Sequence, residues 1–273
     1  MATASKGWAV ITGASAGLGV EFARQLSKRG YDVVLTARRR DRLEQLAKEL
    51  ESSRGVKTMV IECDLSAPGA SATIVRALEE RSIVPEVLVN NAGIGAHGPA
   101  IELPVARATA MIDLNVTSLT ELSLVLGAKM AARGSGGIVN VSSTASFQPS
   151  PHFAVYAATK AFVTSFSMAL ACELAPRGVR VVAHCPGPTR TEFNDVNDVR
   201  AAAGEWVYMS AERCVAIGLR ALERGRWLVV TGLFNKIGAF IARRSPLWIV
   251  TRVTGIIMRP SRPSRALPAG GAG

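Results

Sequence analysis

The stretch Thr12-Gly13-Ala14-Ser15-Ala16-Gly17-Leu18-Gly19 decides the fold, because it joins the short apolar run Trp8-Ala9-Val10-Ile11 to residues with helical spacing. A glycine-rich turn between a strand and a helix lets the backbone approach a phosphate closely. The helix N-terminus then supplies free N–H groups and a partial positive charge. The spacing Gly13-x-x-x-Gly17-x-Gly19 is one residue longer than the common dinucleotide fingerprint, and glycines also serve tight turns. The turn therefore indicates a dinucleotide site only together with other motifs.

Strand-like apolar runs alternate with helix-like runs along the chain. Near-continuous apolar strands separated by amphipathic helices indicate a parallel sheet that is covered on both faces. The handedness of crossover connections then favours a Rossmann-like, doubly wound α/β fold of about seven strands in a single domain. The expected strands are 8–11, 32–37, 56–61, 86–89, 137–141, 179–183 and 227–230, and the expected helices are 17–29, 40–50, 70–80, 104–132 and 153–175.

The chain of 273 residues has a net charge of +11, and the distribution of this charge matters more than its size. Residues 234–273 contain seven of the 32 basic side chains and no acidic one, which leaves only +4 on residues 1–233. Most of the excess belongs to the C-terminal segment. A body-wide nucleic-acid surface is therefore not expected, since no basic motif interleaved with aromatic residues occurs elsewhere.

Cysteine usage and hydropathy favour a cytoplasmic protein with reduced thiols. The four cysteines are scattered, without a CxxC pair or a histidine at metal-ligand spacing, so no metal site is expected. The first apolar run leads directly into glycines, which does not resemble a signal peptide. The most apolar long stretch, 237–258, contains Arg243, Arg244, Pro246 and Arg252 and should not span a bilayer.

A second motif, Tyr156-Ala157-Ala158-Thr159-Lys160, follows Ser143 by thirteen residues. A free phenol has a pKa of about 10, too high for proton transfer at neutral pH. Lys160 lies one helical turn from Tyr156 on the same face, and its positive charge should lower the pKa of the phenol. Ser142 is an alternative to Ser143, but the thirteen-residue offset favours Ser143. Together these side chains form a group that could move a proton beside a bound dinucleotide.

The end of the second expected strand indicates which dinucleotide binds. NAD-selective sites usually place a carboxylate there for the ribose 2′-hydroxyl, whereas a 2′-phosphate requires cations. This chain has Arg38, Arg39 and Arg40 and no carboxylate before Asp41. Arg38 could stack on adenine and bind a phosphate, while Arg39 and Arg40 could equally begin a solvated helix. The sequence predicts that NADP (NADPH) is preferred over NAD.

Over roughly residues 6–235 the chain resembles the short-chain dehydrogenases/reductases. The resemblance rests on an ordered set of landmarks, each in the expected place among the strands and helices. These are Thr12-Gly-x-x-x-Gly-x-Gly19, Asp64, Asn90-Asn91-Ala92-Gly93, Asn115, Ser143, Tyr156-x-x-x-Lys160 and Pro186-Gly187. The resemblance implies an oxidoreductase acting on CH–OH donors with NAD(P), in which a hydride passes between the nicotinamide and a carbonyl carbon.

The resemblance also implies a role for each catalytic candidate. Tyr156 would be the general acid or base, and Lys160 would bind the nicotinamide ribose. Ser143 would hold the carbonyl oxygen, and Asn115 would bind a water that links Lys160 to solvent. Asparagine is a poor former of helix interiors, so Asn115 within an expected helix needs a functional or burial reason.

The same resemblance places the cofactor along the glycine turn and the strand ends. Asp64 would accept from the adenine amino group, with a helix cap as the alternative, and Thr189 or Thr191 would reach the carboxamide or pyrophosphate. Asn90 and Asn91 are expected to stabilise the sheet and the adenosine edge. The expected cofactor contacts are Gly13, Ser15, Gly17, Leu18, Gly19, Arg38, Asp64, Asn91, Ala92, Gly93, Tyr156, Lys160, Pro186, Gly187, Thr189 and Thr191.

Three loops, 94–103, 144–153 and 191–210, should shape the substrate site, because specificity is carried by loops at the carboxyl ends of strands. Their apolar content suggests that the substrate is an apolar ketone or aldehyde, such as a fatty acyl, steroid-like or aromatic carbonyl. His97 and His152 are expected only to border this pocket. The apolar and aromatic loop residues behind the suggestion are Phe147, His152, Phe153, Phe193, Trp206, Tyr208 and Met209.

We expect a catalytic domain over 1–235, an amphipathic extension over 236–258 and a disordered Pro/Gly/Arg-rich tail over 259–273. In the extension, Ile249, Val253, Ile256 and Ile257 share one helical face. This face could make peripheral membrane contact through the basic segment, pack on a neighbouring subunit or cover the pocket. By family resemblance a homodimer or homotetramer is expected. A non-catalytic dinucleotide-binding scaffold on the same fold is the alternative to an enzyme.

Overall fold

The computed structural model describes residues 5–192 and 208–259. Within these ranges seven strands form one parallel sheet in the order β3-β2-β1-β4-β5-β6-β7. The strands are β1 (Trp8–Thr12), β2 (Asp32–Ala37), β3 (Thr58–Glu62), β4 (Val87–Asn90), β5 (Gly136–Val141), β6 (Val179–Cys185) and β7 (Leu228–Val230). Every neighbouring pair is parallel. The expectation of a doubly wound Rossmann-like sheet is confirmed.

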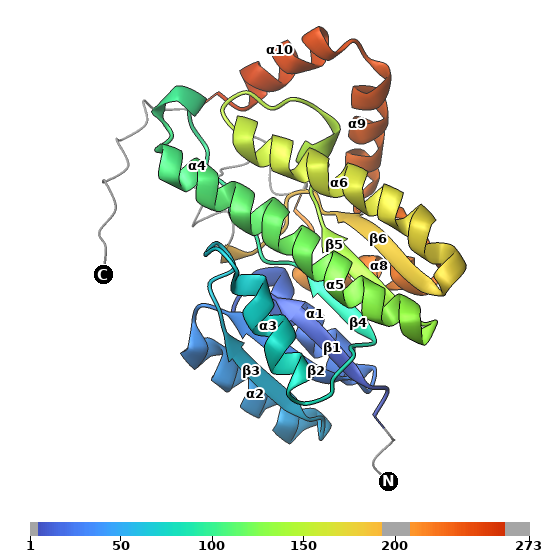
Figure 1. Ribbon diagram of the computed structural model, residues 1–273. Helices are drawn as coiled ribbons and strands as arrows, with labels where there is room; N and C mark the ends of the chain where they lie inside the picture. The colour runs from blue at the N-terminus through green and yellow to red at the C-terminus, as the bar shows by residue number, and fades with distance from the viewer. Residues whose placement is uncertain (1–4, 193–207, 260–273) are drawn as a thin grey trace.

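Helices cover both faces of the sheet, as Figure 1 shows. The helices are α1 (Gly17–Lys28), α2 (Arg40–Arg54), α3 (Ala70–Glu79), α4 (Val105–Ile112), α5 (Ser118–Arg133), α6 (Ala154–Leu174), α8 (Ala211–Glu223), α9 (Leu233–Arg244) and α10 (Leu247–Ile257), with short turns η1 (Ala100–Glu102), η2 (Asp113–Thr117), η3 (Thr144–Phe147) and η4 (Ala175–Arg177). Helices α1, α2 and α8 pack on one face, and α3, α5 and α6 pack on the other.

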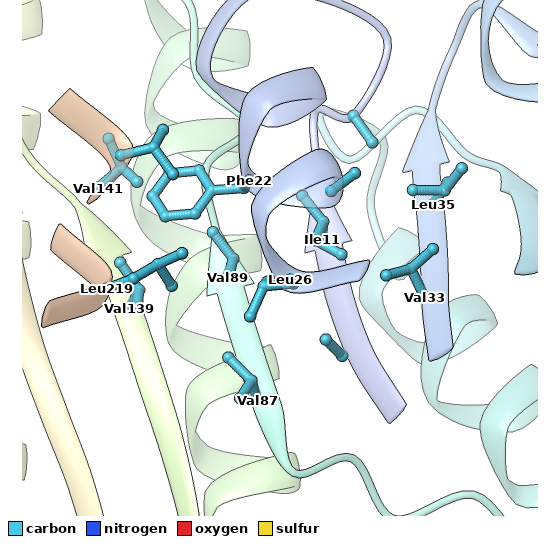
Figure 2. Packing of buried hydrophobic residues seen from close by; sticks show 14 of the residues in the cluster. Ile11, Phe22, Leu26, Val33, Leu35, Val87, Val89, Val139, Val141 and Leu219 are labelled. Carbon is cyan, nitrogen blue, oxygen red and sulfur yellow. The ribbon is translucent and has the colours of Figure 1, made fainter. Parts of the chain in front are cut away.

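The packing of α1 on the sheet shows how the first face is held together. Phe22 and Leu26 lie one turn apart on the buried side of α1 and contact strand residues such as Val89 and Val139 (Figure 2). Phe22 and Val89 are fully buried, and Leu26 is almost so. Burial of such side chains stabilises a fold by about 1.5–3 kcal/mol each, so this face is a principal source of stability.

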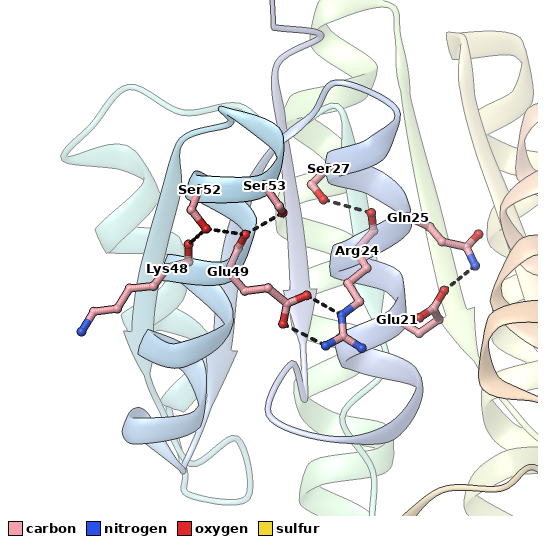
Figure 3. A network of polar contacts seen from close by, with 8 residues as sticks. All are labelled: Glu21, Arg24, Gln25, Ser27, Lys48, Glu49, Ser52 and Ser53. Carbon is pink, nitrogen blue, oxygen red and sulfur yellow. Dashed lines mark hydrogen bonds and ion pairs between the residues drawn. The ribbon is translucent and has the colours of Figure 1, made fainter.

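A polar contact on the surface joins α1 to α2. The Arg24 guanidinium donates two hydrogen bonds of 2.8 Å to the Glu49 carboxylate (Figure 3), which lowers the pKa of Glu49. Both side chains are close to half exposed, and such pairs contribute about 0–1 kcal/mol. The pair therefore orients the two helices more than it stabilises them.

The expected helix 104–132 is present as Val105–Arg133, with an irregular turn inside it. A π-helical turn, Asp113–Thr117, separates α4 from α5 and contains Asn115, whose buried amide bonds to the Ile94 backbone. A π-turn inserts one extra residue and often marks a functional site. The prediction of a long helix is confirmed, but periodicity alone did not reveal the π-turn within it.

Two further elements differ from expectation. Helix α8 was not predicted, although Cys214, Gly218 and Leu222 recur at helical spacing and Ser210 caps its first turn by accepting from the Arg213 N–H. The C-terminal segment forms two helices rather than one, because Pro246 cannot continue α9. The predicted tail 259–273 lies outside the described residues, except for Arg259.

Two helices, Val105–Arg133 and Ala154–Arg177, are long and apolar enough to cross a membrane by length and composition. Both are core helices of the sheet, and 44% of each apolar window is buried within the protein. Their apolar character is explained by this packing.

Replacing a buried leucine of α5 should test the second face. Leu126 is 1% exposed, so we expect Leu126→Ala to lower the free energy of unfolding by about 2–5 kcal/mol, since it removes buried methyl groups and leaves a cavity. Leu124→Ala, two residues away at a position that is 52% exposed, should change it by less than about 0.5 kcal/mol. Urea denaturation measures both, and equal effects would contradict this packing.

Candidate active site

A cavity of about 610 Å³ lies at the carboxyl ends of β1, β4, β5 and β6. Successive strands are added toward one edge of the sheet from β1 to β3 and toward the other edge from β4 on, and such switch points are where doubly wound folds bind ligands. Of the site residues predicted from the sequence, all line this cavity except Gly19 and Asn115. A more open hollow of about 700 Å³ outside β3 shares Arg38, Cys63 and Asp64 with it but contains no predicted catalytic residue.

The glycine turn forms one wall of the cavity. Gly13 and Gly17 have φ angles of +67° and +54°, in the region that favours glycine. A Cβ on Gly13 would lie 2.9 Å from the Ala92 Cα, and a Cβ on Gly17 would lie 3.1 Å from the Thr191 Cβ. Gly19 has another function: a Cβ there would collide with the Gly13 carbonyl oxygen, so Gly19 lets the helix pack against its own turn.

The N-terminus of α1 faces the same wall. Ala16 precedes the helix without a side-chain cap, and Gly17 and Leu18 of the first turn line the cavity. The first N–H groups of a helix lack intrahelical partners and attract anions. The turn thus offers unshielded backbone donors where a pyrophosphate would lie.

Thr12 ties the turn to the end of β4, a function that the sequence did not single out. Its hydroxyl accepts hydrogen bonds of 2.9 Å from the N–H groups of Asn91 and Ala92. The Asn91 side chain donates back to the Thr12 carbonyl at 3.0 Å. These bonds fix the two strand ends, and Gly13, Asn91, Ala92 and Gly93 form one continuous surface of the cavity.

The arginines after β2 divide into two environments. The Arg38 side chain is 68% exposed and lies 3.8 Å from the Asp64 carboxylate. Arg39 instead bonds the Ser15 hydroxyl at 3.2 Å and the Glu192 carboxylate at 3.3 Å. Arg39 therefore contacts the glycine turn directly, whereas Arg38 projects at the edge of the cavity with its charge available to a ligand.

Asp64 forms a local turn with Ser66. Its carboxylate accepts from the Ser66 backbone N–H at 3.0 Å and hydroxyl at 2.7 Å. Partial burial would raise the pKa of Asp64, but these hydrogen bonds and the Arg38 charge hold it below its ordinary value. Since α3 begins at Ala70 with Gly69 as its N-cap residue, Asp64 does not cap that helix.

Lys160 and Tyr156 lie on the buried side of α6, against the end of β5. The Lys160 ammonium donates to the Val141 carbonyl at 2.8 Å and lies 5.7 Å from the centre of the Tyr156 ring. Phe153 stacks on that ring, with 4.3 Å between the ring centres. Only 4% of Lys160 and 6% of Tyr156 are exposed, so a charge that develops here is poorly screened by water.

Ser143 and Ser142 have separate functions. The Ser143 hydroxyl accepts from the Ala145 N–H at 3.1 Å and forms a side-chain hydrogen bond with Tyr156. The Ser142 hydroxyl is buried and donates to the Lys160 carbonyl at 2.9 Å, which fixes α6 to the sheet. The geometry therefore brings Ser143, not Ser142, to the phenol.

Burial controls the protonation of Tyr156 and Lys160. It raises the pKa of Tyr156 to about 12, although the hydrogen bond with Ser143 acts in the opposite direction. It lowers the pKa of Lys160 to about 8. The pKa of Tyr156 is thus raised and not lowered as expected, and loss of hydration is the largest cause. At neutral pH the phenol is protonated, as a proton donor must be.

Asn115 supports the site through the hydrogen bonds of its side-chain amide. Its Nδ2 donates to the Ile94 carbonyl at 2.9 Å and the Thr159 hydroxyl at 3.0 Å, and its Oδ1 accepts from the Ile94 N–H at 3.0 Å. Both amide protons are thus used within the protein, and a water could reach the side chain only through Oδ1. A Cβ on Gly93 would lie 3.1 Å from that oxygen and 3.4 Å from the Lys160 Nζ, which places Asn115 near the lysine.

The segment after β6 closes the far side of the cavity. Pro186, Gly187, Thr189 and Thr191 all line it. The Thr189 hydroxyl donates to the Gly187 carbonyl at 2.9 Å, and the Gly187 N–H donates to the Thr231 hydroxyl at 3.3 Å. These bonds hold the backbone of the segment opposite the glycine turn.

Each of the three loops predicted to shape the substrate end contributes to the cavity wall, through Ile94, through residues of 144–153 and through Thr191. Of the aromatic and apolar loop residues predicted to shape it, Phe153 lines the cavity, and Phe147 instead lines a separate groove with α9. Phe193 and Trp206 lie outside the described residues. Thr254, Ile257 and Met258 at the end of α10 form part of the wall, as one of the three alternatives for the C-terminal extension, covering the pocket, had it. Their contribution depends on a long-range contact that local patterns do not encode.

His97 and His152 lie beside this wall rather than on it. A His97 ring nitrogen is 2.9 Å from the Met258 carbonyl, and the two histidine rings are 6.4 Å apart. In residues 5–192 and 208–259, no group of three metal-binding side chains is assembled.

A glycine turn and a buried tyrosine–lysine pair at the switch point of a parallel sheet define a dinucleotide-dependent oxidoreductase. The family model for short chain dehydrogenases matches residues 7–200. The chain therefore belongs to the short-chain dehydrogenase/reductase family, whose members are NAD(P)-dependent oxidoreductases.

Two curated relatives illustrate this similarity. The chain is 35% identical over 193 residues to a very-long-chain 3-oxoacyl-CoA reductase-A of Danio rerio, covering 69% of this chain and 60% of the relative. It is 38% identical over 186 residues to sulfoacetaldehyde reductase 2 of Chromohalobacter salexigens, covering 67% and 73%. The match thus spans about three fifths of the longer relative.

Solved structures are similar over most of the described chain. A short-chain dehydrogenase from Sphingobium yanoikuyae in complex with NADPH has a TM-score of 0.79 and 32% identity, covering 87% of this chain and 93% of that one. A 7β-hydroxysteroid dehydrogenase has a TM-score of 0.82 and 27% identity, covering 91% and 96%.

The lowered pKa of Lys160 predicts a pH-dependent stability. Between the folded value of about 8 and the ordinary value of 10.5, the unfolded chain binds a proton that the folded chain has released, so wild-type stability rises with pH. Below about pH 8 the folded protein carries the buried Lys160 charge, which lowers its free energy of unfolding. Lys160→Met, which lacks this charge, should therefore gain stability relative to wild type. That difference in free energy of unfolding should shift by about 3 kcal/mol toward wild type as pH rises through this window. Urea titrations at several pH values measure it, and a difference that does not change with pH would contradict the assignment.

Proposed function

We propose that the protein is an NADPH-dependent reductase of an apolar ketone or aldehyde. In the reverse direction the same site would oxidise the alcohol. The observation that carries the proposal is the convergence of Ser143, Tyr156 and Lys160 on one cavity with the glycine turn. The chain's membership of the short-chain dehydrogenase/reductase family supports it.

The residues of the cavity fit a dinucleotide. Gly13 and Gly17 leave space that a side chain would fill, and the uncapped start of α1 offers N–H groups for a pyrophosphate. Lys160 would bind the nicotinamide ribose and Thr189 or Thr191 the carboxamide. When bound, NADPH would supply the hydride that reduces the carbonyl carbon.

In this proposal Tyr156 donates its proton to the carbonyl oxygen of the substrate. The high pKa of the buried phenol keeps the proton in place at neutral pH, and the Lys160 charge favours the phenolate that forms during transfer. Ser143 donates a hydrogen bond that positions the carbonyl oxygen and offsets its growing negative charge. Asn115 is a positioning residue, since it holds the Ile94 backbone beside Lys160.

Preference for NADPH is supported by the charges after β2. Arg38 is exposed at the edge of the cavity, 3.8 Å from Asp64, and Arg39 borders the turn, 3.3 Å from Glu192. A guanidinium binds a 2′-phosphate through paired, charge-assisted hydrogen bonds, whereas a 2′-hydroxyl offers it no charge. The solved relatives that carry NADPH are consistent with this preference.

An apolar substrate is supported by the side chains near Tyr156. Phe153 and Met111 pack with the tyrosine, and Ile94, Ala145 and Met258 complete this apolar cluster. Relatives named for very-long-chain 3-oxoacyl-CoA and for 17-beta-hydroxysteroid substrates are consistent with this choice. We therefore propose a ketone flanked by a long acyl chain or fused rings.

A non-catalytic dinucleotide-binding scaffold is the second candidate considered. A scaffold would have no need to bury a lysine ammonium beside a tyrosine and a serine hydroxyl, since burial of a charge is costly. This arrangement favours the enzyme. Oligomeric state and cytoplasmic location stay predictions.

Removal of the phenolic hydroxyl tests the proton donor. Tyr156→Phe should bind NADPH with unchanged affinity but lose about 10²–10⁴-fold in reductase turnover, since it keeps the ring and removes the proton. Tyr31→Phe removes a hydroxyl far from the cavity and should leave turnover unchanged. Fluorescence titration of NADPH and single-turnover oxidation measure the two quantities. Full turnover in Tyr156→Phe would refute this role.

Reversal of charge at Arg38 tests the cofactor preference. Arg38→Asp should reduce the ratio of NADPH to NADH affinity by roughly 10- to 100-fold, because a favourable pair with the 2′-phosphate becomes repulsive. Arg54→Asp makes the same charge change at the other end of α2 and is the control. An unchanged ratio in Arg38→Asp, or equal affinities for the two dinucleotides in wild type, would overturn the assignment.

A further inference from the structure

Helix α9 presents its apolar residues to the outside. Ala239 and Ala242 are the residues of α9 that are buried, each 8% exposed. Large apolar side chains on its other side are 48–69% exposed, which reverses the usual orientation of an amphipathic helix. These outward residues are Leu233, Phe234, Ile237, Phe240 and Ile241.

Helix α10 continues this surface. None of its residues, 247–257, is buried, and Trp248 and Ile256 are 63% and 77% exposed. The outward residues Leu247, Trp248, Ile249, Val253, Ile256 and Ile257, together with the five of α9, are called the α9–α10 face below. Contiguous exposed apolar residues on this scale mark an interaction surface rather than ordinary exposure.

The charges around the α9–α10 face have one sign. Residues 224–259 contain seven arginines and lysines and no aspartate or glutamate. The Arg244 guanidinium lies 4.6 Å from the centre of the Phe240 ring, and that of Arg252 lies 5.5 Å from the Trp248 ring. Aromatic rings and cations are thus held together at the surface, a combination suited to the boundary between water and lipid.

A basic groove adjoins the face. It has a volume of about 560 Å³ between β7, η3 and α9 and is lined by Arg226, Lys236, Arg243 and Arg244, with no carboxylate among its lining residues. The apolar side chains of Phe147 and Phe240 form part of its wall. Because no lining carboxylate balances these four cations, the groove fits an anionic group that enters it from the α9–α10 face.

We propose that the α9–α10 face docks the protein on the surface of an anionic lipid bilayer, with lipid headgroups among the cations. Helices of 12 and 11 residues are about 18 Å long at most and cannot cross a hydrocarbon core of about 30 Å. They lie in the interface, where the apolar side chains enter the acyl region and each basic residue gains from the negative surface potential.

Charge favours the bilayer over a second copy of the chain. In a symmetric dimer the same patch meets itself, so the arginines of one copy would approach those of the other without a carboxylate to offset them. An anionic membrane satisfies both the apolar and the cationic parts of the face. Figure 1 shows α9 and α10 as an angled pair at the edge of the molecule, opposite the N-terminus.

Docking would also orient the active-site cavity. Helix α10 contributes to the cavity as well as to the α9–α10 face. Thr254, Ile257 and Met258 border the cavity, while Trp248 and Ile256 of the α9–α10 face are exposed and do not line it. The Thr254 hydroxyl donates to the Pro149 carbonyl at 2.9 Å and joins the helix to the loop before α6. The bilayer would therefore lie against the helix that forms one wall of the cavity. Membrane docking itself does not rest on the proposed reductase function.

Vesicle binding by the full chain tests the proposal. Wild type should sediment with vesicles of phosphatidylcholine and phosphatidylglycerol and bind vesicles of phosphatidylcholine alone about tenfold or more weakly, since the cations lose their partners. Added salt should weaken the first interaction. Trp248→Ser with Ile256→Ser, and separately Arg243→Glu with Arg244→Glu, should each lower binding by about tenfold or more.

Matched variants control for general effects on the surface. Leu124→Ser and Arg177→Glu change exposed residues of α5 and η4 and should bind as wild type does. Equal thermal melting of all variants shows that the fold is intact. Failure of wild type to bind anionic vesicles, or wild-type binding by both face variants, overturns the proposal. Loss of a dimer in the Trp248→Ser/Ile256→Ser variant, with vesicle binding unchanged, would assign the face to a second copy instead.

Discussion

Parallel pairing of β1, β4, β5 and β6 is the constraint on which the site depends. Because all strands run in one direction, their carboxyl ends meet at one edge, and the register sets Asn90 beside Asn140 and Val141 beside His184. Residues from four distant parts of the chain thereby reach one cavity. The hydrogen bonds of Thr12 with Asn91 and Ala92 then fix the first two ends against each other.

Burial gives the tyrosine–lysine pair its chemical character. The Val141 carbonyl holds the Lys160 ammonium at the end of β5, and the sheet and α6 exclude water from both side chains. Loss of hydration disfavours the charged form of each group, so it raises the pKa of Tyr156 and lowers that of Lys160. The expectation from charge alone, that the lysine lowers the tyrosine pKa, omitted this larger effect.

Local patterns predicted most of the fold, because most strands are nearly continuous apolar runs and several of the connecting turns carry glycine. They predicted a cluster of site residues because strand ends of a parallel sheet share an edge. They did not predict the π-helical turn at Asn115, which depends on its contact with the Ile94 backbone. They also left open whether the C-terminal extension covers the pocket, since the position of α10 is set by contacts with residues a hundred positions away. The separate positions of Arg38 and Arg39 likewise depend on tertiary partners, Asp64 and Ser15.

The central claim is that one fold brings a dinucleotide and the Tyr156 phenol to the same carbonyl group. A crystal structure with NADP and a substrate analogue measures this most directly. The account predicts the pyrophosphate at the turn from Gly13 to Gly19, and the Tyr156 hydroxyl within hydrogen-bonding distance of the analogue's carbonyl oxygen. A dinucleotide bound elsewhere, or a Tyr156 ring turned away from the analogue, would contradict it.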